Sequence, residues 1–269
     1  MQLRIAVIQS SVTGNLNENI NEITRLIQLA SSKNADFIAL PELWIHSSPT
    51  LFINKLADHY QSIIEKLASI SKSFELAIVG GGLYVRENQH VRIACPVIDS
   101  SGEVLGCQYK VHLFDEERVL FKPGDKFDVF RVGGTNIGIA ICHDIVYPES
   151  VRILALKGAD IVINPSRIIT EGIKPWHLYL MTRSLENRIP IVAPNIWIEK
   201  RFDGGSIIVK PVEKERGIFI PSINKLRNGS AVLIGKVDTE KLKKARTDRL
   251  MGRRPEVYCE LIMNNHQGD

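Results

Sequence analysis

The chain has 269 residues, 44% of them hydrophobic, and a formal net charge of +4 at pH 7. This length and composition allow a full hydrophobic core, in one large domain or two small ones. Basic residues are densest at 241–254 and do not alternate with aromatic side chains, so the charge does not indicate a nucleic-acid-binding protein.

Four cysteines, Cys95, Cys107, Cys142 and Cys259, are far apart and form no CxxC pair. This spacing indicates neither a disulfide framework nor a zinc site, and it is typical of a protein from a reducing compartment. No signal-peptide pattern is visible at the start, and no apolar run approaches about 20 residues. We therefore expect a soluble cytoplasmic protein without membrane contact.

Hydrophobic periodicity predicts strands that alternate with helices. In the first half we expect helices at 15–33 and 51–74, and strands at 3–9, 36–40, 76–84, 90–99 and 103–109. In the second half we expect helices at 148–157, 175–188 and 239–246, and strands at 127–132, 135–141, 160–164, 190–194, 206–210, 231–237 and near 257–262. This order predicts a single α/β domain, with one large mixed sheet or two sheets covered by helices.

Three glycines, at 80–82, interrupt the predicted strand 76–84. They lack the GxxxxGK[ST] spacing and a following helix, which argues against a phosphate-binding loop. A strand bulge or a close approach of another backbone segment is the better interpretation.

Three chemically versatile residues follow predicted buried strands, at the edge where sites in α/β folds assemble. Glu42 is enclosed by apolar neighbours, so desolvation should raise its pKa and make it a stronger general base. Lys110 could stabilise a developing oxyanion, and Cys142 could be a nucleophile. Taken singly, each has a plainer interpretation: a surface glutamate, a strand-end lysine and a buried, inert cysteine.

Two other kinds of site can be considered around Cys142. Residues 142–144 (CHD) resemble a Cys/His/Asp triad, but adjacent side chains on an extended chain point to opposite faces. A metal could be sought among His112, His143, Asp144 and Glu149, although the chain has no HExxH, HxH or paired cysteines. We expect no metal and no organic cofactor.

Together, the motifs resemble those of the nitrilase, or carbon–nitrogen hydrolase, superfamily. The resemblance lies in residues 41–43 (PEL), 109–114 (YKVHLF) with 121–125 (FKPGD), and 138–144 (GIAICHD) with 147–149 (YPE). Later matches are Trp176, residues 183–187 (RSLEN), Asn195 and residues 205–211 (GSIIVKP). The likeness extends from about residue 3 to residue 258. It implies a four-layer α-β-β-α sandwich with two mixed sheets, and packing of the tail from about residue 239 at an edge or in a dimer.

Carried over to this sequence, the resemblance makes Glu42 the general base, Lys110 the electrostatic stabiliser and Cys142 the nucleophile. It implies that Glu117 supports the site, although the adjacent Glu116 could turn inward instead. The backbone N–H of His143 would join Lys110 in an oxyanion hole.

Substrate-binding candidates are Trp44, Trp176 and Arg167, although packing in the core is the alternative for each tryptophan. Many amidase members of the family, and the members that cleave N-carbamoyl amino acids, carry an arginine shortly after the cysteine, whereas this chain has residues 145–147 (IVY). That difference argues against a carbamoyl-D-amino acid substrate.

The resemblance implies a thiol hydrolase that cleaves a small non-peptide amide through a cysteine thioester and forms at least a homodimer. A nitrilase, an N-carbamoyl hydrolase and a non-catalytic binding protein of the same fold are alternatives, and a metal hydrolase is a fourth.

Overall fold

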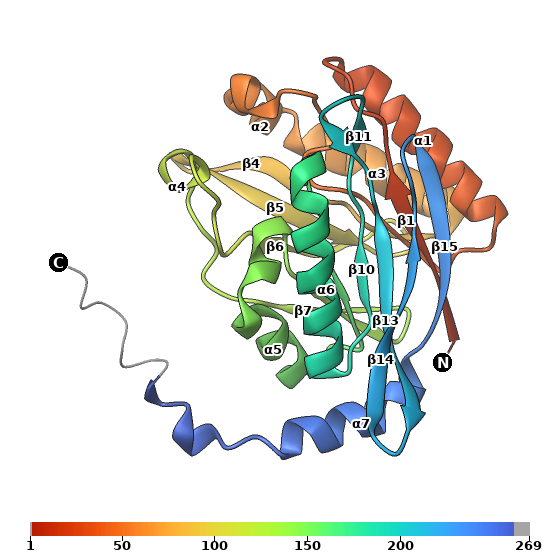
Figure 1. The fold of residues 1–269 in the computed structure, drawn as a ribbon. Coiled ribbons are helices and arrows are strands. Elements are labelled where there is room, and N and C mark those ends of the chain that lie inside the picture. Colours follow the sequence, from red (N-terminus) through yellow and green to blue (C-terminus); the bar gives the residue numbers. More distant parts are fainter. Residues whose placement is uncertain (1, 261–269) are drawn as a thin grey trace.

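The structure, a computed structural model, describes residues 2–260. Two β-sheets pack face to face, and helices cover both outer faces (Figure 1). Within the described residues, the first sheet has the order β15 (Ala231–Asp238), β1 (Gln2–Gln9), β2 (Phe37–Ala39), β3 (Ala77–Val79), β5 (His90–Ile98) and β4 (Leu83–Glu87), with β6 (Val104–Tyr109) paired to β5. Its outer face is covered by α1 (Leu16–Ser32) and α3 (Tyr60–Phe74).

The second sheet is likewise mixed. In the described part of the chain its order is β14 (Ile218–Lys225), β13 (Ile207–Glu215), β10 (Ile191–Ala193), β9 (Ile161–Ile163), β8 (Thr135–Ile139) and β7 (Val129–Val132). Helices α5 (Pro148–Leu156) and α6 (Ile173–Asn187) pack on its outer face. The predicted α-β-β-α sandwich with two mixed sheets is therefore confirmed.

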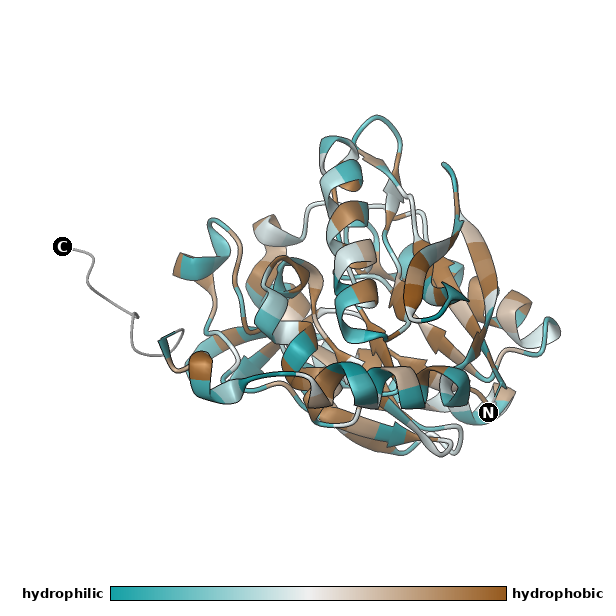
Figure 2. Ribbon diagram, turned by 60° about the horizontal axis from the view of Figure 1, so that its bottom comes forward, coloured by the Kyte–Doolittle hydropathy of each residue, from teal (hydrophilic) through white to brown (hydrophobic). Residues whose placement is uncertain are grey.

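The strands of the second sheet are apolar on both sides because both sides are covered. Ile161 and Ile163 pack in the core shared with the first sheet, whereas Val162 between them packs in the core under α5 and α6. This arrangement explains why the buried strands appear in the sequence as continuous apolar runs. Figure 2 shows the apolar strands inside and the more hydrophilic helical surfaces outside.

Helix α1 begins at a side-chain cap. The side chain of Asn15 accepts hydrogen bonds from the backbone N–H groups of Asn17 (2.9 Å) and Glu18 (3.3 Å). This cap satisfies two N–H groups that have no partner inside the helix. The residues of α1 that face the sheet are buried, among them Ile23, Leu26 and Ile27.

Several elements differ from the sequence-based predictions. The helix expected at 51–74 divides into a 3₁₀ turn (Pro49–Phe52), α2 (Ile53–Asp58) and α3, because the chain turns at His59 and α2 packs against β4. Strand β14 was not predicted, because it is an edge strand whose side chains are partly or fully exposed and which contains a proline, so its sequence lacks a clear strand pattern.

The strand expected near 257–262 is wrong for the described residues, which form a 3₁₀ turn at Pro255–Val257. This segment lies beyond α7 (Thr239–Met251) and away from both sheets, so no sheet edge is available to it (Figure 1). Residues 261 and 262 are outside the described part. Helix α7 itself packs at the edge of the sandwich, where Arg246 binds Asp160 at 3.0 Å. Within residues 2–260, no helix has both the length and the apolar composition needed to span a membrane.

Helix α1 offers a matched test of this packing. Leu26→Ala should lower the free energy of unfolding by about 2–5 kcal/mol, because Leu26 is fully buried and its truncation leaves a cavity. Leu29→Ala, on the solvent-facing side of the same helix, should change it by less than about 1 kcal/mol. Urea denaturation followed by circular dichroism measures both, and equal losses would contradict this placement of α1.

Candidate active site

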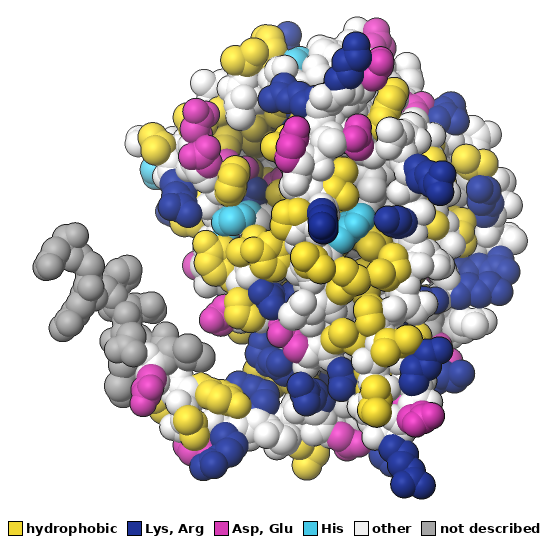
Figure 3. Space-filling model, viewed as in Figure 1, with side chains coloured by type: hydrophobic (Ala, Val, Ile, Leu, Met, Phe, Trp, Pro, Cys, Tyr) yellow, Lys and Arg dark blue, Asp and Glu magenta, His cyan; other side chains and the backbone are white. Residues whose placement is uncertain are grey.

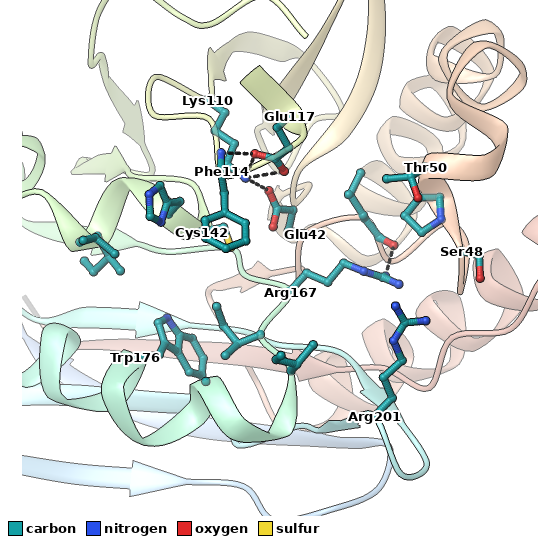
Figure 4. Close-up of a pocket in the computed structure, with 18 of the residues that line it drawn as sticks. Glu42, Ser48, Thr50, Lys110, Phe114, Glu117, Cys142, Arg167, Trp176 and Arg201 are labelled. Carbon is teal, nitrogen blue, oxygen red and sulfur yellow. Dashed lines mark hydrogen bonds and ion pairs between the residues drawn. The ribbon is translucent and has the colours of Figure 1, made fainter. Parts of the chain in front are cut away.

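A pocket of about 650 Å³ opens where several strands end. Glu42 follows β2, Lys110 follows β6, Cys142 follows β8 and Arg167 follows β9. All four side chains line this pocket, as Figure 4 shows. The ends of these strands therefore meet at one pocket.

The Lys110 ammonium group lies between two carboxylates. Its Nζ atom is 2.9 Å from Oε1 of Glu42, and it is 2.9 Å and 2.8 Å from the two carboxylate oxygens of Glu117. Oε2 of Glu117 also accepts the backbone N–H of Phe114 at 2.8 Å, which holds the turn before α4 (Glu117–Leu120). Glu117 rather than Glu116 therefore faces inward. Only 1% of the Lys110 side chain is exposed.

Cys142 begins a 3₁₀ helix, η2 (Cys142–Val146), with a backbone φ of +46°. Residues other than glycine rarely adopt this left-handed conformation, and surrounding contacts must hold it. The Cys142 N–H donates to the carbonyl of Pro165 at 2.8 Å, and the amide of Asn164 donates to the Cys142 carbonyl at 3.2 Å. The loop after β9 thus holds the nucleophile candidate in place.

The buried charges of the site shift one another's pKa values. Burial raises the pKa of the Cys142 thiol well above its ordinary value, and the Glu42 carboxylate adds to this effect while Lys110 opposes it. Burial also raises the pKa of Glu42, although Lys110 counteracts part of the shift. Burial alone would lower the pKa of Lys110, but Glu42, Cys142 and Glu117 together raise it. At neutral pH the site therefore holds a protonated thiol and a charged lysine.

The glycines at 80–82 make room for Glu42. A Cβ atom at Gly82 would lie only 2.7 Å from Cγ of Glu42. The Glu42 N–H donates to the Ser166 carbonyl at 3.1 Å, and the N–H of Leu43 donates to the Gly82 carbonyl at 2.8 Å. The close backbone approach expected at the glycine run is confirmed.

Asp144 is a fully buried residue whose role the sequence did not reveal. Its Oδ1 atom accepts the backbone N–H of His112 at 2.7 Å and lies 2.9 Å from His112 Nδ1, while Oδ2 accepts the N–H of Ile141 at 2.8 Å. Asp144 thus joins the loop of Lys110 to the loop of Cys142. Because it pairs with His112 and not with His143, residues 142–144 do not form a triad.

The His143 ring lines the pocket and contacts Phe114 and Tyr147 edge-on, at centroid distances of 5.0 and 5.4 Å. Burial, with a contribution from Lys110, lowers its pKa, so the imidazole is neutral at pH 7. Among residues 2–260, no cluster of three His, Cys, Asp or Glu side chains could hold a metal ion.

The predicted substrate-binding residues fall in different places. Trp176 lines the pocket, and its indole donates to Oδ1 of Asn164 at 2.9 Å. Arg167 also lines the pocket, but its guanidinium donates to the backbone carbonyls of Leu43, His46 and Ser47. Trp44 is instead a core residue, 1% exposed, whose indole donates to the Gly80 carbonyl.

Several pocket residues were not predicted from the sequence. Tyr84, on β4, has a buried hydroxyl group that, among the described residues, has no hydrogen-bond partner. Arg201 reaches the pocket from the loop between β11 (Trp197–Ile198) and β12 (Phe202–Asp203), and Ser48 and Thr50 reach it from the segment after Glu42. These residues belong to no motif, and only the three-dimensional arrangement brings them together.

The chain is similar in sequence to a family model and to several known proteins. A family model described as carbon–nitrogen hydrolase matches residues 4–247. The chain is 26% identical over 225 residues to omega-amidase NIT2 of Xenopus tropicalis, covering 78% of this chain and 82% of the relative. It is 29% identical over 221 residues to 2-oxoglutaramate amidase of Bacillus subtilis, covering 78% and 84%.

A solved structure of an amidase from Nesterenkonia sp. AN1 superposes with a TM-score of 0.83 at 25% identity, covering 96% of this chain and 99% of that one. That structure is a mutant with acrylamide added to its active-site cysteine.

The raised pKa of Cys142 can be measured directly. The thiolate absorbs near 240 nm, so the difference between wild type and Cys142→Ser reports the ionisation of this one group. A model thiol is half ionised at about pH 8.5. Because burial and Glu42 disfavour the thiolate, Cys142 should show almost none at that pH and should ionise only at higher pH. A thiolate signal already complete at pH 7 would contradict the electrostatic description of this site.

Proposed function

Because the chain belongs to the carbon–nitrogen hydrolase family, we propose that it is a thiol amidase that cleaves a small non-peptide amide through a cysteine thioester. The observation that carries this proposal is the contact of the buried Lys110 ammonium with Glu42 and Glu117, in the pocket that Cys142 also lines. The relatives named as amidases and the adduct on the active-site cysteine of the Nesterenkonia enzyme support it.

In the first step, Glu42 accepts the thiol proton as the sulfur of Cys142 attacks the amide carbonyl. A base is required because the resting thiol is protonated, and the raised pKa of Glu42 makes it a stronger base than an ordinary carboxylate. The new S–C bond leaves a negative charge on the carbonyl oxygen. Lys110 and the backbone N–H of His143, in the first turn of η2, stabilise this oxyanion.

In the second step, the C–N bond breaks as Glu42 returns the proton to the leaving nitrogen, and ammonia or an amine departs. Glu42 then accepts a proton from water, and the resulting hydroxide attacks the thioester. The S–C bond breaks, the carboxylic acid leaves, and Cys142 recovers its proton. Glu117 holds Lys110 in place throughout, and no step requires a metal or an organic cofactor.

The proposal is tested by ammonia release from small amides, nitriles and N-carbamoyl compounds, with wild type and Cys142→Ala side by side. We expect ammonia from amides with the wild type only, and a loss of about a thousandfold or more in Cys142→Ala, since the variant lacks the nucleophile. Intact mass at early times should show an acyl adduct on the wild type. A chelator should leave the rate unchanged.

Ammonia release by Cys142→Ala at the wild-type rate would contradict the mechanism. Faster release from nitriles or N-carbamoyl compounds than from amides would favour those alternatives. Absence of turnover with the whole panel would favour the binding protein of the same fold.

We also propose that the protein forms at least a homodimer. Apolar side chains on α5 and α6 are exposed in the single chain, namely Ile153, Leu156, Leu178 and Tyr179. Figure 3 shows hydrophobic side chains gathered over these two helices. Such a patch commonly marks a protein interface.

Light scattering at micromolar concentration should give the mass of a dimer or a larger assembly. Leu178→Glu should reduce it to that of a monomer, because the new charge would be buried without a partner. Leu29→Glu on α1 is the control and should leave the mass unchanged. A monomeric wild type would refute this proposal.

A further inference from the structure

The hydroxyl group of Tyr84 is a polar group of the pocket that the mechanism above does not use. It is buried, and among residues 2–260 it has no hydrogen-bond partner, although Tyr84 lines the pocket. Buried phenol hydroxyls usually have a partner, because a hydrogen bond left unmade away from water destabilises the protein. This hydroxyl is therefore available to a molecule that enters the pocket.

Tyr84 points to the side of the first sheet on which Glu42 lies. Tyr84 on β4 is directly opposite Ile93 on β5, so their two side chains are on the same face. A Cβ atom at Gly82 would lie 3.2 Å from Cγ2 of Ile93 and 2.7 Å from Cγ of Glu42. The side chains of Ile93, Glu42 and Tyr84 are therefore neighbours on one face of the sheet.

Phe121 fixes the orientation of the Tyr84 ring. The two rings stack with a centroid distance of 5.0 Å and an angle of 28° between their planes. The Phe121 N–H donates to the Glu117 carbonyl at 2.9 Å, so the turn that places Glu117 against Lys110 also places Phe121. Aromatic packing thus holds the Tyr84 ring, and the hydroxyl is left free to donate a hydrogen bond.

The charges around this hydroxyl keep it protonated. Burial raises the pKa of Tyr84, and the carboxylates of Glu42 and Glu117 raise it further, whereas Arg167 and Lys110 oppose the shift. At neutral pH the side chain is therefore a phenol with one O–H donor. Neither carboxylate accepts this O–H group in the structure, so the donor lies near Glu42 without being bonded to it.

Thioester hydrolysis is the step that requires a further donor near Glu42. The carbonyl oxygen already has two proposed donors, Lys110 and the His143 N–H. The attacking water, however, must be held between Glu42 and the acyl carbon on Cys142, and Glu42 lies beside Cys142 (Figure 4). Oε1 of Glu42 binds Lys110 at 2.9 Å, which leaves the other oxygen to accept a proton from water. A second hydrogen bond, to the water oxygen, would fix the orientation of the attack.

We propose that Tyr84 is a further catalytic residue, whose hydroxyl donates a hydrogen bond to the water that hydrolyses the thioester. Glu42 accepts a proton from this water, and the remaining hydroxide forms the new C–O bond to the acyl carbon. The C–S bond then breaks, and the proton on Glu42 passes to the sulfur of Cys142. Tyr84 keeps its own proton throughout. This inference rests on the proposed amidase function and adds a residue to the second half of its reaction.

The ester p-nitrophenyl acetate isolates this step, because its good leaving group makes thioester formation fast and thioester hydrolysis limiting. The wild type should release a burst of p-nitrophenolate before a slower linear phase. Tyr84→Phe removes only the hydroxyl, so the burst rate should stay the same and the linear rate should fall about tenfold, the effect of one lost hydrogen bond. By intact mass, the acetyl group should remain on the variant about tenfold longer once the ester is exhausted.

The steady-state constants separate this role from a structural one. In Tyr84→Phe, kcat and KM should fall by the same factor, so that kcat/KM, which reports thioester formation, stays at the wild-type value. Tyr60→Phe is the control, because it removes the hydroxyl of a half-buried tyrosine on α3 that does not line the pocket. It should keep the wild-type burst and linear rates. Circular dichroism checks that both variants are folded.

Two results would overturn the inference. The first is a Tyr84→Phe variant with wild-type burst and linear rates, whether or not its thermal midpoint changes, because the hydroxyl would then be structural only. The second is an equal loss in both phases, because the hydroxyl would then not act on the water step.

The same ester distinguishes failure of this inference from failure of the proposed function. If no amide is cleaved but the ester still acetylates Cys142, the amidase proposal fails, and the comparison of Tyr84→Phe with the wild type still decides the role of the hydroxyl. If the ester does not acetylate Cys142, both proposals are overturned.

Discussion

The site depends on one buried ammonium group. Lys110 is almost completely removed from solvent, and burying such a charge costs several kcal/mol unless partners replace the lost water. Glu42 and Glu117 supply those partners at 2.8–2.9 Å. Glu42 and Lys110 are 68 positions apart in the sequence, so this ion pair forms only when the two segments are folded together.

Two further charged residues hold the loops in the required positions. Asp144 connects the loop of Lys110 to the loop of Cys142, and Arg167 connects the loop after β9 to the segment that follows Glu42. Both act mainly on backbone atoms and therefore fix the path of the chain. These contacts explain how Cys142 can retain a left-handed φ, since the surrounding hydrogen bonds contribute more free energy than the strained conformation costs.

The sequence predicted what depends on local pattern. The strand ends before Glu42, Lys110 and Cys142 could be predicted because apolar runs stop there. The glycines at 80–82 indicated the close approach of another backbone segment. Contacts between distant segments were not visible: nothing near Asp144 shows that its carboxylate binds His112, and Trp44 is equally compatible with a pocket and with the core. Residues such as Arg201 and Tyr84 belong to no motif, so only their position in the fold places them at the pocket.

The electrostatics of the cluster bear on the first chemical step that we propose. A thiol with a raised pKa is a poor nucleophile, and its ionisation alone would place a new charge in a buried region. When Glu42 takes the proton, however, the negative charge passes from one buried group to another, and the total charge of the site does not change. Lys110 contacts Glu42 and also lowers the pKa of Cys142. Its positive charge can therefore stabilise the negative charge on the carboxylate, and then on the sulfur and the oxyanion. The same burial that suppresses the free thiolate therefore does little to oppose a transfer of the proton within the site.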